Sequence, residues 1–450
     1  MTVLPDWSLP PREAVTSFLE RLTGPCRILV AVSGGSDSIG LLLSLHTVLA
    51  AAGGKQHSLV AATIDHDLRA EAAGEAEAVA RQCHELSIPH TILCWSDEKP
   101  SSGISAAARE ARYRLLMDAA DQLAADVIVT GHTLDDQLET VAMRASRSEA
   151  GANLGLAGMA EAVLLDRRRW LLRPFLATRR EAIRDFLRQS GRGWIDDPSN
   201  ADRHYERVRV RESLDKADTA LEAVQSSARR RFQLAEGAAG LARRHLHITH
   251  GVLARLAPEA LNEEAEVLRH LLASLAAILG GRQHLPAAAT MDLVMAMLDR
   301  RSMGRMTAGR VIFDLRREGL YLHRENRDLT ALTVVKGATG IWDGRYRICN
   351  HTDRDIEVGP AALQRSVAIA MFPDAPPAIA MRAAGVMPHI EREFTPSVAV
   401  DKATVIVEPV LSPYDRFLPQ FELILGCALR HLFGYEAFPA APIKVFERKS

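Results

Sequence analysis

The chain has little cysteine, almost no net charge and no long apolar run. Its five cysteines include no Cys-x-x-Cys pair, which disfavours both a disulfide framework and a cysteine-rich zinc site. No apolar stretch approaches the roughly 20 residues that a membrane helix needs. The N-terminus lacks the basic-then-apolar layout of a secretory signal. These absences predict a cytoplasmic protein with free thiols and no membrane partner.

The net charge of -1 does not by itself suggest a nucleic-acid partner, but the charges are unevenly distributed. Between Asp166 and Arg231 there are about 17 basic and 11 acidic side chains. Nearly all of the basic ones are arginine, which binds phosphate groups in a bidentate manner. This tract suits either a phosphate-binding surface or a solvated, salt-bridged helical surface, and charge alone does not choose between them.

The first half of the sequence alternates between strand and helix signals. Short apolar runs predict buried strands at 26–32, 58–64, 90–95, 126–130 and 170–173. Helical segments are predicted at 39–49, 71–86, 105–123, from 134 onward, and at 178–188. This order indicates the α/β fold class, with βαβ units forming a doubly wound parallel sheet that helices cover on both faces.

Length predicts more than one domain, because 450 residues are too many for one ordinary core. Residues 1–215 hold the strand–helix alternation and are expected to form the α/β domain. Residues 216–325 are rich in Ala, Leu and Arg with a helical period, and predict a mainly helical middle domain with hardly any strand. Residues 335–450 have mixed character and predict a small α+β C-terminal domain.

A Gly/Ser-rich segment lies between the first strand and the first helix. Its residues are Ser33, Gly34, Gly35, Ser36, Asp37 and Ser38. Glycines let the backbone approach a ligand, and N–H groups that open a helix form an anion cradle. The serines add hydroxyl donors, and Asp37 suits a Mg²⁺ ion held against phosphates. The segment matches neither G-x-x-x-x-G-K-[ST] nor G-x-G-x-x-G, which disfavours a kinase-like NTPase and a dinucleotide enzyme.

A second polar segment, Gly131–Thr140, lies where the fourth strand ends and a helix begins. Asp136 and Glu139 are three residues apart, so on a helix they share one face. Two carboxylates together with nucleotide oxygens suit Mg²⁺. The alternative is that acidic residues cap the helix N-terminus, a role that suits Asp135.

The S-G-G-x-D-S segment resembles the PP-loop of N-type ATP pyrophosphatases, enzymes that adenylate an oxygen of their substrate and release pyrophosphate. The G-H-x-x-D-D-Q-x-E-T segment is similar to the signature of one branch, the tRNA(Ile)-lysidine synthetases. Further similar segments follow in the family's order, at 65–69, 103–113, 172–175, 194–200 and 207–211. The chain departs from the family at Asp67, where Gly is usual, and at Val208, where Asn is common. The resemblance is strong over roughly residues 24–215 and faint beyond 230.

The resemblance implies a PP-loop ATPase type of sheet, ATP and Mg²⁺ as cofactors, and ligation of free L-lysine to C2 of the wobble cytidine in tRNA(Ile). The cytidine of the CAU anticodon would first be adenylated. By resemblance, ATP binds over Ser33–Ser38, and Asp37 and Asp136 bind the metal. The catalytic residues would be Asp37, Arg112, His132, Asp136 and Glu139, and the tRNA or substrate contacts would be Arg207 and Arg211. A homodimer is compatible with this assignment.

Three alternatives stay open. A tRNA thiolase with the same loop normally needs a cysteine pair to deliver sulfur, and none is spaced for it here. A glutamine-hydrolysing synthetase needs a domain with a nucleophilic cysteine, which the roughly 25 residues before the first strand cannot hold. A nucleotide-gated RNA-binding protein without turnover belongs to another class, and an ATP–pyrophosphate exchange assay distinguishes it from a ligase.

Overall fold

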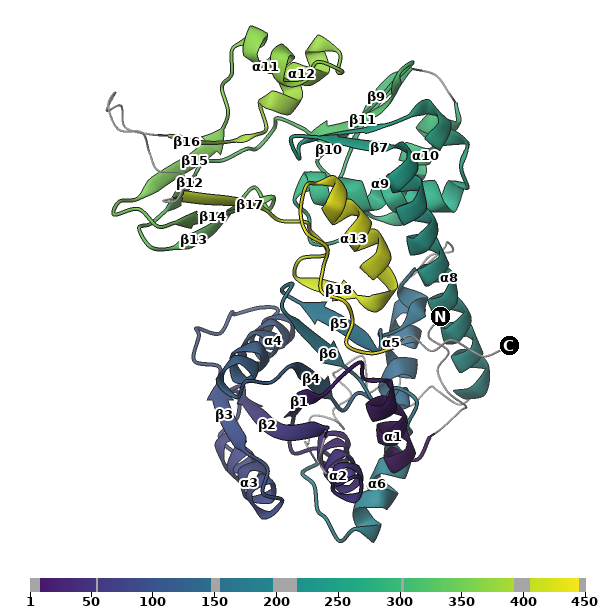
Figure 1. Ribbon diagram of the computed structural model, residues 1–450, viewed down its shortest axis with the longest axis vertical. Helices are drawn as coiled ribbons and strands as arrows, with labels where there is room; N and C mark the ends of the chain where they lie inside the picture. Colours follow the sequence, from purple (N-terminus) through teal and green to yellow (C-terminus); the bar gives the residue numbers. More distant parts are fainter. Residues whose placement is uncertain are drawn as a thin grey trace. The chain divides into compact units, whose positions relative to one another are not determined.

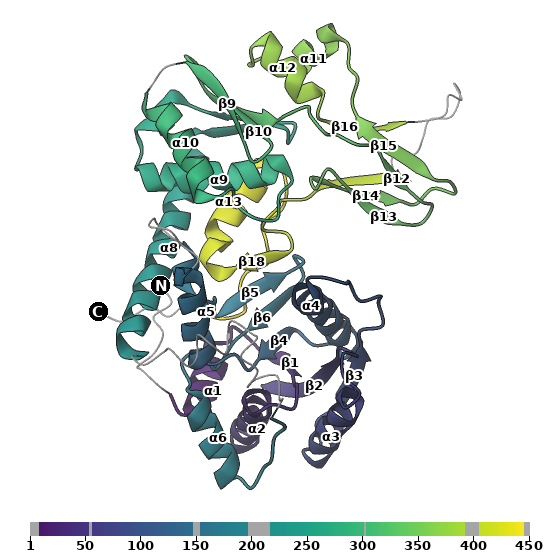
Figure 2. The same ribbon diagram turned by 180° about the vertical axis from the view of Figure 1, so that it is seen from behind.

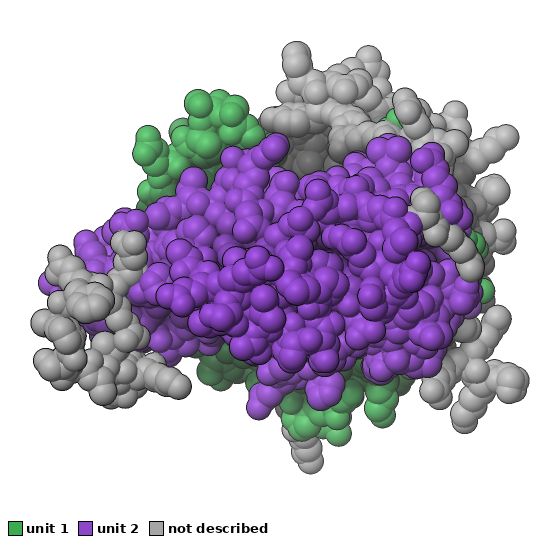
Figure 3. Space-filling model, turned by 90° about the horizontal axis from the view of Figure 1, so that it is seen from above, with its two compact units in different colours: residues 1–232, 419–421, 439–450 green, residues 233–418, 422–438 purple. Residues whose placement is uncertain are grey.

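The computed structural model describes residues 9–53, 56–146, 154–196, 217–300, 303–391 and 405–444. Its internal contacts divide the chain into two compact units, which Figure 3 colours separately. The first unit contains residues 1–232, 419–421 and 439–450, and the second contains residues 233–418 and 422–438. None of the described helices combines the length and apolar character needed to cross a membrane.

The first unit is built on a mostly parallel sheet in which its strands follow the order β5-β6-β4-β1-β2-β3 (Figure 1). These strands are β1 (Cys26–Ala31), β2 (His57–Asp65), β3 (His90–Cys94), β4 (Val127–Thr130), β5 (Ala162–Leu165) and β6 (Arg169–Leu172). Strands β1, β2, β3, β4 and β6 are parallel to their neighbours in that series, whereas β5 is antiparallel to β6. The predicted doubly wound α/β fold is confirmed, with one strand, β5, that the sequence pattern did not indicate.

The described residues of this unit contain six helices that accompany the sheet: α1 (Pro11–Arg21), α2 (Ser36–Ala51), α3 (Ala72–Glu85), α4 (Ile104–Gln122), α5 (Leu134–Ser146) and α6 (Arg180–Gln189). Helices α1, α2 and α6 lie side by side (Figure 1 and Figure 2). The winding reverses direction between β3 and β4, so right-handed crossovers place α4 on the opposite face from α2 and α3.

The winding reversal brings β1 and β4 together at the centre of the sheet. They pair in parallel, with Ala31 opposite Thr130 at their carboxyl ends. The segments that follow these two strands are therefore neighbours at one edge of the sheet. Ligands of doubly wound sheets bind at such a switch point.

The C-terminal residues of the chain complete this first unit. The Thr23 N–H donates to the Pro442 carbonyl at 3.0 Å, and the Lys444 N–H donates to the Arg21 carbonyl at 2.8 Å. Leu22 and Ile443 form an isolated antiparallel bridge, and Ile443 is buried. The α/β unit is consequently built from both ends of the sequence.

The second unit begins within the long helix α8 (Ala217–His245), and its described residues form three antiparallel sheets. The largest has the order β7-β8-β11-β10-β9, formed by β7 (Leu246–Thr249), β8 (Leu253–Leu256), β11 (Gly319–Arg324), β10 (Val311–Arg316) and β9 (Gly304–Ala308). The other two are β12 (Leu332–Val334), β15 (Ile356–Pro360) and β16 (Pro388–Glu391), and β13 (Thr339–Trp342), β14 (Tyr346–Asn350) and β17 (Val405–Pro409).

The helices of this unit are α9 (Ala265–Gly280), α10 (Ala288–Asp299), α11 (Arg365–Met371), α12 (Pro377–Ala384) and α13 (Leu423–Leu432). Helices α9 and α10 pack on the five-stranded sheet. The expected helical middle region is therefore only partly helical, and the expectation of hardly any strand there was wrong. Strands β7 and β8 have four residues each, too few to show a period. They pair with each other, and the second partner of β8, strand β11, lies more than 60 residues later. The predicted division into three domains stays a prediction.

A buried carboxylate organises the second unit. Asp343, in the turn between β13 and β14, forms ion pairs with Arg310, with Arg324 at 3.1 Å and with Arg345 at 2.6 Å. The Arg324 side chain is fully buried. All three guanidinium groups also donate to backbone carbonyls, those of Gly280, Glu325 and Val386. This cluster ties the end of α9 to strands β10, β11 and β14.

Candidate active site

The predicted phosphate loop is the turn between β1 and α2. Helix α2 begins at Ser36 with Gly35 at the N-cap, and no side chain caps its first turn. The Ser38 hydroxyl holds the turn closed by donating to the Gly35 carbonyl at 3.0 Å and accepting from the Ser33 N–H at 3.1 Å. The first N–H groups of α2 are therefore available for an anion, since a helix leaves its first N–H groups without partners inside the helix.

Gly34 adopts the left-handed φ of +85° that makes this turn possible. It was expected to give a ligand close access to the backbone, but a protein segment occupies that space. The Ile195 N–H donates to the Gly34 carbonyl at 2.9 Å, and a Cβ on Gly34 would lie 2.9 Å from Ile195 Cδ1. Gly34 thus admits the chain segment around Ile195.

The second predicted segment opens helix α5 and is capped by its own side chains. Asp136 Oδ2 accepts from the Thr133 N–H at 2.8 Å and from the Thr133 hydroxyl at 2.9 Å. This is a capping box, in which a residue in the first turn reaches back to the N-cap. The expected cap, Asp135, has another role: its Oδ2 accepts from the Arg180 N–H at 2.8 Å and so anchors the start of α6.

The phosphate loop and the start of α5 converge at the switch point of the sheet. Gly131 allows this approach, because a Cβ there would lie 2.7 Å from the Asp37 carbonyl oxygen. Asp37 and Asp136 thereby face the same space at the carboxyl ends of β1 and β4. Glu139, one turn further along α5, is buried and faces the same space.

Arg180, which the sequence reasoning missed, lies between these three carboxylates. Its Nε donates to Asp37 Oδ2 at 2.9 Å, and its Nη2 donates to Asp136 Oδ1 at 2.9 Å. Its Nη1 lies 3.7 Å from Glu139 Oε1. A signal was present in the sequence: an arginine in the first turn of a helix opposes the helix dipole and needs acidic partners.

The charges of this cluster affect one another. Burial raises the pKa of Asp37, the Arg180 guanidinium opposes that rise, and the neighbouring Asp136 adds to it. The three carboxylates raise the pKa of Arg180 despite its burial. The cluster therefore brings three carboxylates to one point, an arrangement that attracts cations.

His132, at the carboxyl end of β4, is held neutral. Burial lowers the pKa of its imidazole to about 3, and the nearby positive charges of Arg173, Arg112 and Arg109 contribute, while Asp136 opposes the shift. The His132 Nδ1 lies 2.9 Å from the Thr130 hydroxyl. Arg112, the predicted catalytic arginine on α4, thus lies within electrostatic range of His132.

The described arginines of the tract between Asp166 and Arg231 form a salt-bridged surface, which is the second of the two interpretations that the charge count allowed. Ion pairs link Arg168 and Arg169 to Asp121, Arg184 to Asp196, Arg188 to Glu181 and Asp185, and Arg192 to Glu85. Arg173 is almost completely buried and donates to the Ala160 carbonyl at 2.6 Å. Arg207 and Arg211, the predicted tRNA contacts, lie outside the described residues.

The described residues contain no group of three or more His, Cys, Asp or Glu side chains placed to hold a metal ion. Asp37 and Asp136 nevertheless present one carboxylate oxygen each to a common point, where Arg180 now lies. Two carboxylates suit an ion that brings further oxygen ligands with it, as Mg²⁺ does when phosphates carry it. The donor set fits a metal that arrives with a nucleotide.

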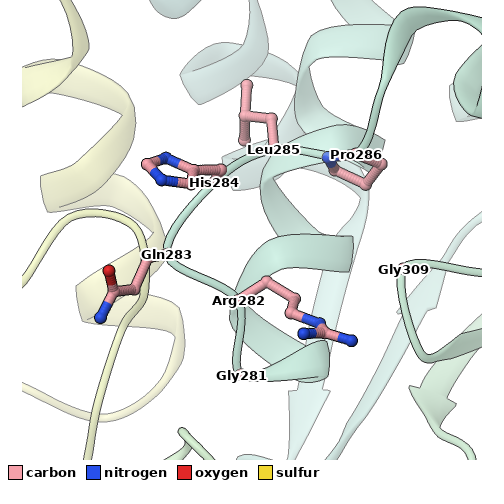
Figure 4. Close-up of a pocket in the computed structure, with 7 residues that line it drawn as sticks. All are labelled: Gly281, Arg282, Gln283, His284, Leu285, Pro286 and Gly309. Atoms are coloured by element: carbon pink, nitrogen blue, oxygen red, sulfur yellow. The ribbon is translucent and has the colours of Figure 1, made fainter. Parts of the chain in front are cut away.

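A separate cavity of about 440 Å³ lies in the second unit (Figure 4). The loop after α9, residues 281–286, lines it together with Gly309. None of the predicted site residues takes part in it. It offers no nucleophile or paired carboxylates, so we assign no chemistry to it.

The comparisons with known proteins agree with this geometry. A family model described as the PP-loop domain matches residues 11–217. The chain is 42% identical over 439 residues to the tRNA(Ile)-lysidine synthase of Rhizobium meliloti (strain 1021), covering 96% of this chain and 97% of that protein. It is 40% identical over 431 residues to the tRNA(Ile)-lysidine synthase of Mesorhizobium japonicum, covering 92% of this chain and 94% of that protein.

Among solved structures, a U34-tRNA thiolase from Methanococcus maripaludis, with its [4Fe-4S] cluster, aligns with a TM-score of 0.41 and 15% identity. The alignment covers 49% of this chain and 77% of the other, a similarity too low to bear on function.

The switch-point loop and the acidic residues beside it define a PP-loop protein of the ATP-binding class. Because the similarity extends over nearly the whole length, the chain belongs to the tRNA(Ile)-lysidine synthase family.

Proposed function

We propose that this chain is an ATP-dependent ligase that joins L-lysine to C2 of the wobble cytidine of tRNA(Ile). The observation that carries the proposal is the near full-length similarity to lysidine synthases, which extends well beyond the nucleotide-binding region. The convergence of Asp37, Asp136 and Glu139 on one point beside the phosphate loop supports it.

In the first step the C2 carbonyl oxygen of the cytosine attacks the α-phosphorus of ATP, and pyrophosphate leaves. Ser33–Ser38 hold the phosphates at the N-terminus of α2, where N–H groups and the helix dipole favour an anion. Asp37 and Asp136 are the proposed Mg²⁺ ligands, and the ion when bound neutralises phosphate charge and supports pyrophosphate as a leaving group.

In the second step the ε-amine of lysine attacks C2, and AMP leaves. Free lysine carries an ε-ammonium group that the carboxylates of Asp136 and Glu139 attract to the site. The ammonium must lose its proton before the nitrogen attacks. Glu139 is proposed to orient the amine, because its carboxylate is buried beside the same point as Asp37 and Asp136.

His132 and Arg112 are proposed to contact the reacting phosphate or the charge that develops on the base. A histidine with a pKa of about 3 is a poor proton acceptor, so His132 acts as a neutral hydrogen-bonding group. Arg112 supplies positive charge near the same place, and its effect on the pKa of His132 indicates that proximity. Together they would stabilise negative charge opposite the acidic cluster.

The tRNA is proposed to bind through residues beyond 216 and through Arg207 and Arg211, because a single wobble base must be held unstacked while remote contacts position it. The described arginines of the tract, engaged in ion pairs, have a smaller share in this than their number suggests. Charge reversal at Arg207 or Arg211 should weaken binding across tRNAs and reduce its salt dependence.

Sulfur transfer is disfavoured by the thiols themselves. Burial raises the pKa of Cys83 to about 11, and it also raises the pKa of Cys26, Cys94 and Cys427. A sulfur-carrying cysteine needs a lowered pKa, because the thiolate is the reactive form.

The test is ATP–pyrophosphate exchange and mass spectrometry of the tRNA nucleosides, with and without tRNA(Ile) and lysine. We expect tRNA-dependent adenylation, and a nucleoside heavier than cytidine by lysine minus water only when lysine is present. A sulfur-containing nucleoside, or no turnover with intact ATP binding, would replace this proposal with one of its rivals.

A further inference from the structure

We propose that Arg180 is the resident counterion of the nucleotide-free site and keeps a free metal ion out until nucleotide arrives. This proposal rests on the proposed function in one respect, that Asp37 and Asp136 are the metal ligands. It adds Arg180 as a positioning residue. The Arg180 guanidinium binds the same carboxylate oxygens as the metal ion, before the ion arrives with the nucleotide.

The contacts of Arg180 show that it takes the place of a cation. Asp37 Oδ2 and Asp136 Oδ1 are each 2.9 Å from a guanidinium nitrogen of Arg180. The second oxygens of both carboxylates are engaged elsewhere: Asp37 Oδ1 accepts from the Ser36 hydroxyl, and Asp136 Oδ2 accepts from Thr133. The oxygens that face Arg180 are the ones these two residues have to offer a metal ion.

The main chain of Arg180 is fixed, while its guanidinium group has phosphate oxygens as an alternative partner. Its N–H is bound to Asp135, and α6 is pressed against α2 where a Cβ on Gly40 would overlap the Ile183 Cγ2 methyl. Gly40 and Ile183 lie one turn beyond Asp37 and Arg180 on their helices, so this close packing sets the Arg180–Asp37 distance. Phosphate oxygens delivered to the start of α2 are strong acceptors for a guanidinium group.

Nucleotide binding then becomes an exchange of partners. The two carboxylates release Arg180 and bind the metal ion that the nucleotide carries. The Arg180 guanidinium releases the carboxylates and binds the phosphates. Each of these charged groups keeps a partner of opposite charge before and after the exchange. A free divalent ion cannot bring this about, because it offers Arg180 no anion in return and must displace a positive charge held by three carboxylates.

The test measures Mn²⁺ binding to the nucleotide-free full-length chain by electron paramagnetic resonance, in which free Mn²⁺ gives the signal. Wild-type protein should bind Mn²⁺ weakly without nucleotide. Arg180→Gln should bind it about tenfold or more tightly, because a unit positive charge next to the ligands is removed. Arg180→Lys, which keeps the charge but not the fork of donors, should fall between the two.

Two control variants separate the metal effect from structural damage. Arg188→Gln removes an exposed arginine from the same helix, one that pairs with Glu181 and Asp185, and should leave Mn²⁺ binding at the wild-type level. Adding Asp136→Asn to Arg180→Gln should abolish the gained affinity. Should Arg180→Gln fail to fold, the comparison of Arg180→Lys with wild type decides the question.

Folded Arg180 variants that bind Mn²⁺ no more tightly than wild type would overturn the proposal, and so would a gain that persists in the Asp136→Asn background. These measurements contain neither tRNA nor lysine. A failure of the proposed ligase reaction would appear in the nucleoside analysis and leave the Mn²⁺ result unchanged, so the two failures are distinguishable.

Discussion

Each unit of this protein contains one charged group among three of the opposite sign. In the first unit the single cation Arg180 lies among Asp37, Asp136 and Glu139. In the second unit the anion Asp343 lies among Arg310, Arg324 and Arg345, and Arg324 also lies 4.0 Å from Glu325. The two clusters have central charges of opposite sign and different surroundings.

The two clusters differ in what else surrounds their charged groups. Around Asp343 the surplus arginine donors are bound to backbone carbonyls, so the cluster is complete within the protein. Around Arg180 three carboxylates lie near one guanidinium group, the start of α2 has no side-chain cap, and the cluster lies at the switch point of a doubly wound sheet. An ionic cluster completed by backbone acceptors holds a fold together, whereas an ionic cluster beside the open N-terminus of a helix at a switch point is suited to a ligand.

The largest effect should come from Asp37→Asn, which keeps the size of the side chain and removes its charge. We expect the rate of tRNA-dependent adenylation to fall by about 10²–10³-fold, because the carboxylate acts on the nucleotide and its metal. The thermal midpoint should change little. Asp121→Asn is the matched control, since this exposed carboxylate pairs with Arg168 and Arg169 of the same unit and should retain full activity. Equal losses of adenylation rate in both variants would contradict the assignment of Asp37 to the nucleotide site.

Asp343→Asn should lower stability and leave activity nearly unchanged, which is the opposite of the result expected for Asp37→Asn. Three arginines, one of them fully buried, would lose their common anion, and breaking a buried ionic cluster costs about 3–5 kcal/mol. Urea denaturation should show this loss in the free energy of unfolding. Adenylation per folded molecule should be nearly unchanged at low denaturant. A variant as stable as wild type would show that the cluster has no structural role.

Gly40→Ala tests the packing that places Arg180. The new methyl would overlap Ile183 Cγ2 and move α6 away from α2, at a cost of about 1–3 kcal/mol. Adenylation should also slow, because the Arg180–Asp37 contact is one turn away. Adding Ile183→Ala should restore part of the rate even if stability stays low. If the double variant showed no recovery of the adenylation rate, the packing of α6 on α2 would not control the position of Arg180.

The smallest effect concerns His132 and pH. Its pKa is about 3 in the folded chain and about 6.5 when unfolded, so between these values the unfolded chain binds more protons. This group therefore destabilises the fold increasingly as pH falls through that window. His132→Gln should lose less stability than wild type between about pH 7 and pH 5 in denaturant titrations. Parallel curves for the two proteins would mean that His132 keeps an ordinary pKa.

Local sequence signals were sufficient for the parallel strands of the α/β unit, and not for its antiparallel strand β5 or for the strands of the second unit. The apolar runs around Val30 and Val129 identified the central strands, and the glycine and serine content of the following turn identified the phosphate loop. Strands such as β5 and β7 have four residues and pair at an edge or with distant segments, so no period identified them.

The sequence motifs contain the three acids that the structure brings together, and they do not contain the arginine that lies between them. Asp37, Asp136 and Glu139 stand in two short motifs, each beside a strand end. Arg180 reaches them only because Gly40 lets α6 pack closely on α2, and this contact joins residues more than 140 positions apart. Asp135 and Asp136 are adjacent in sequence, and only the geometry distinguishes the residue that caps α5 from the residue that anchors α6.

The pairing of Thr23 and Arg21 with Pro442 and Lys444 has a consequence for synthesis of the protein. The paired residues lie more than 400 positions apart in the sequence. Contacts over such a sequence separation form late, because loop closure must precede them. A ribosome that stops before residue 442 therefore releases a chain whose α/β unit lacks these backbone hydrogen bonds.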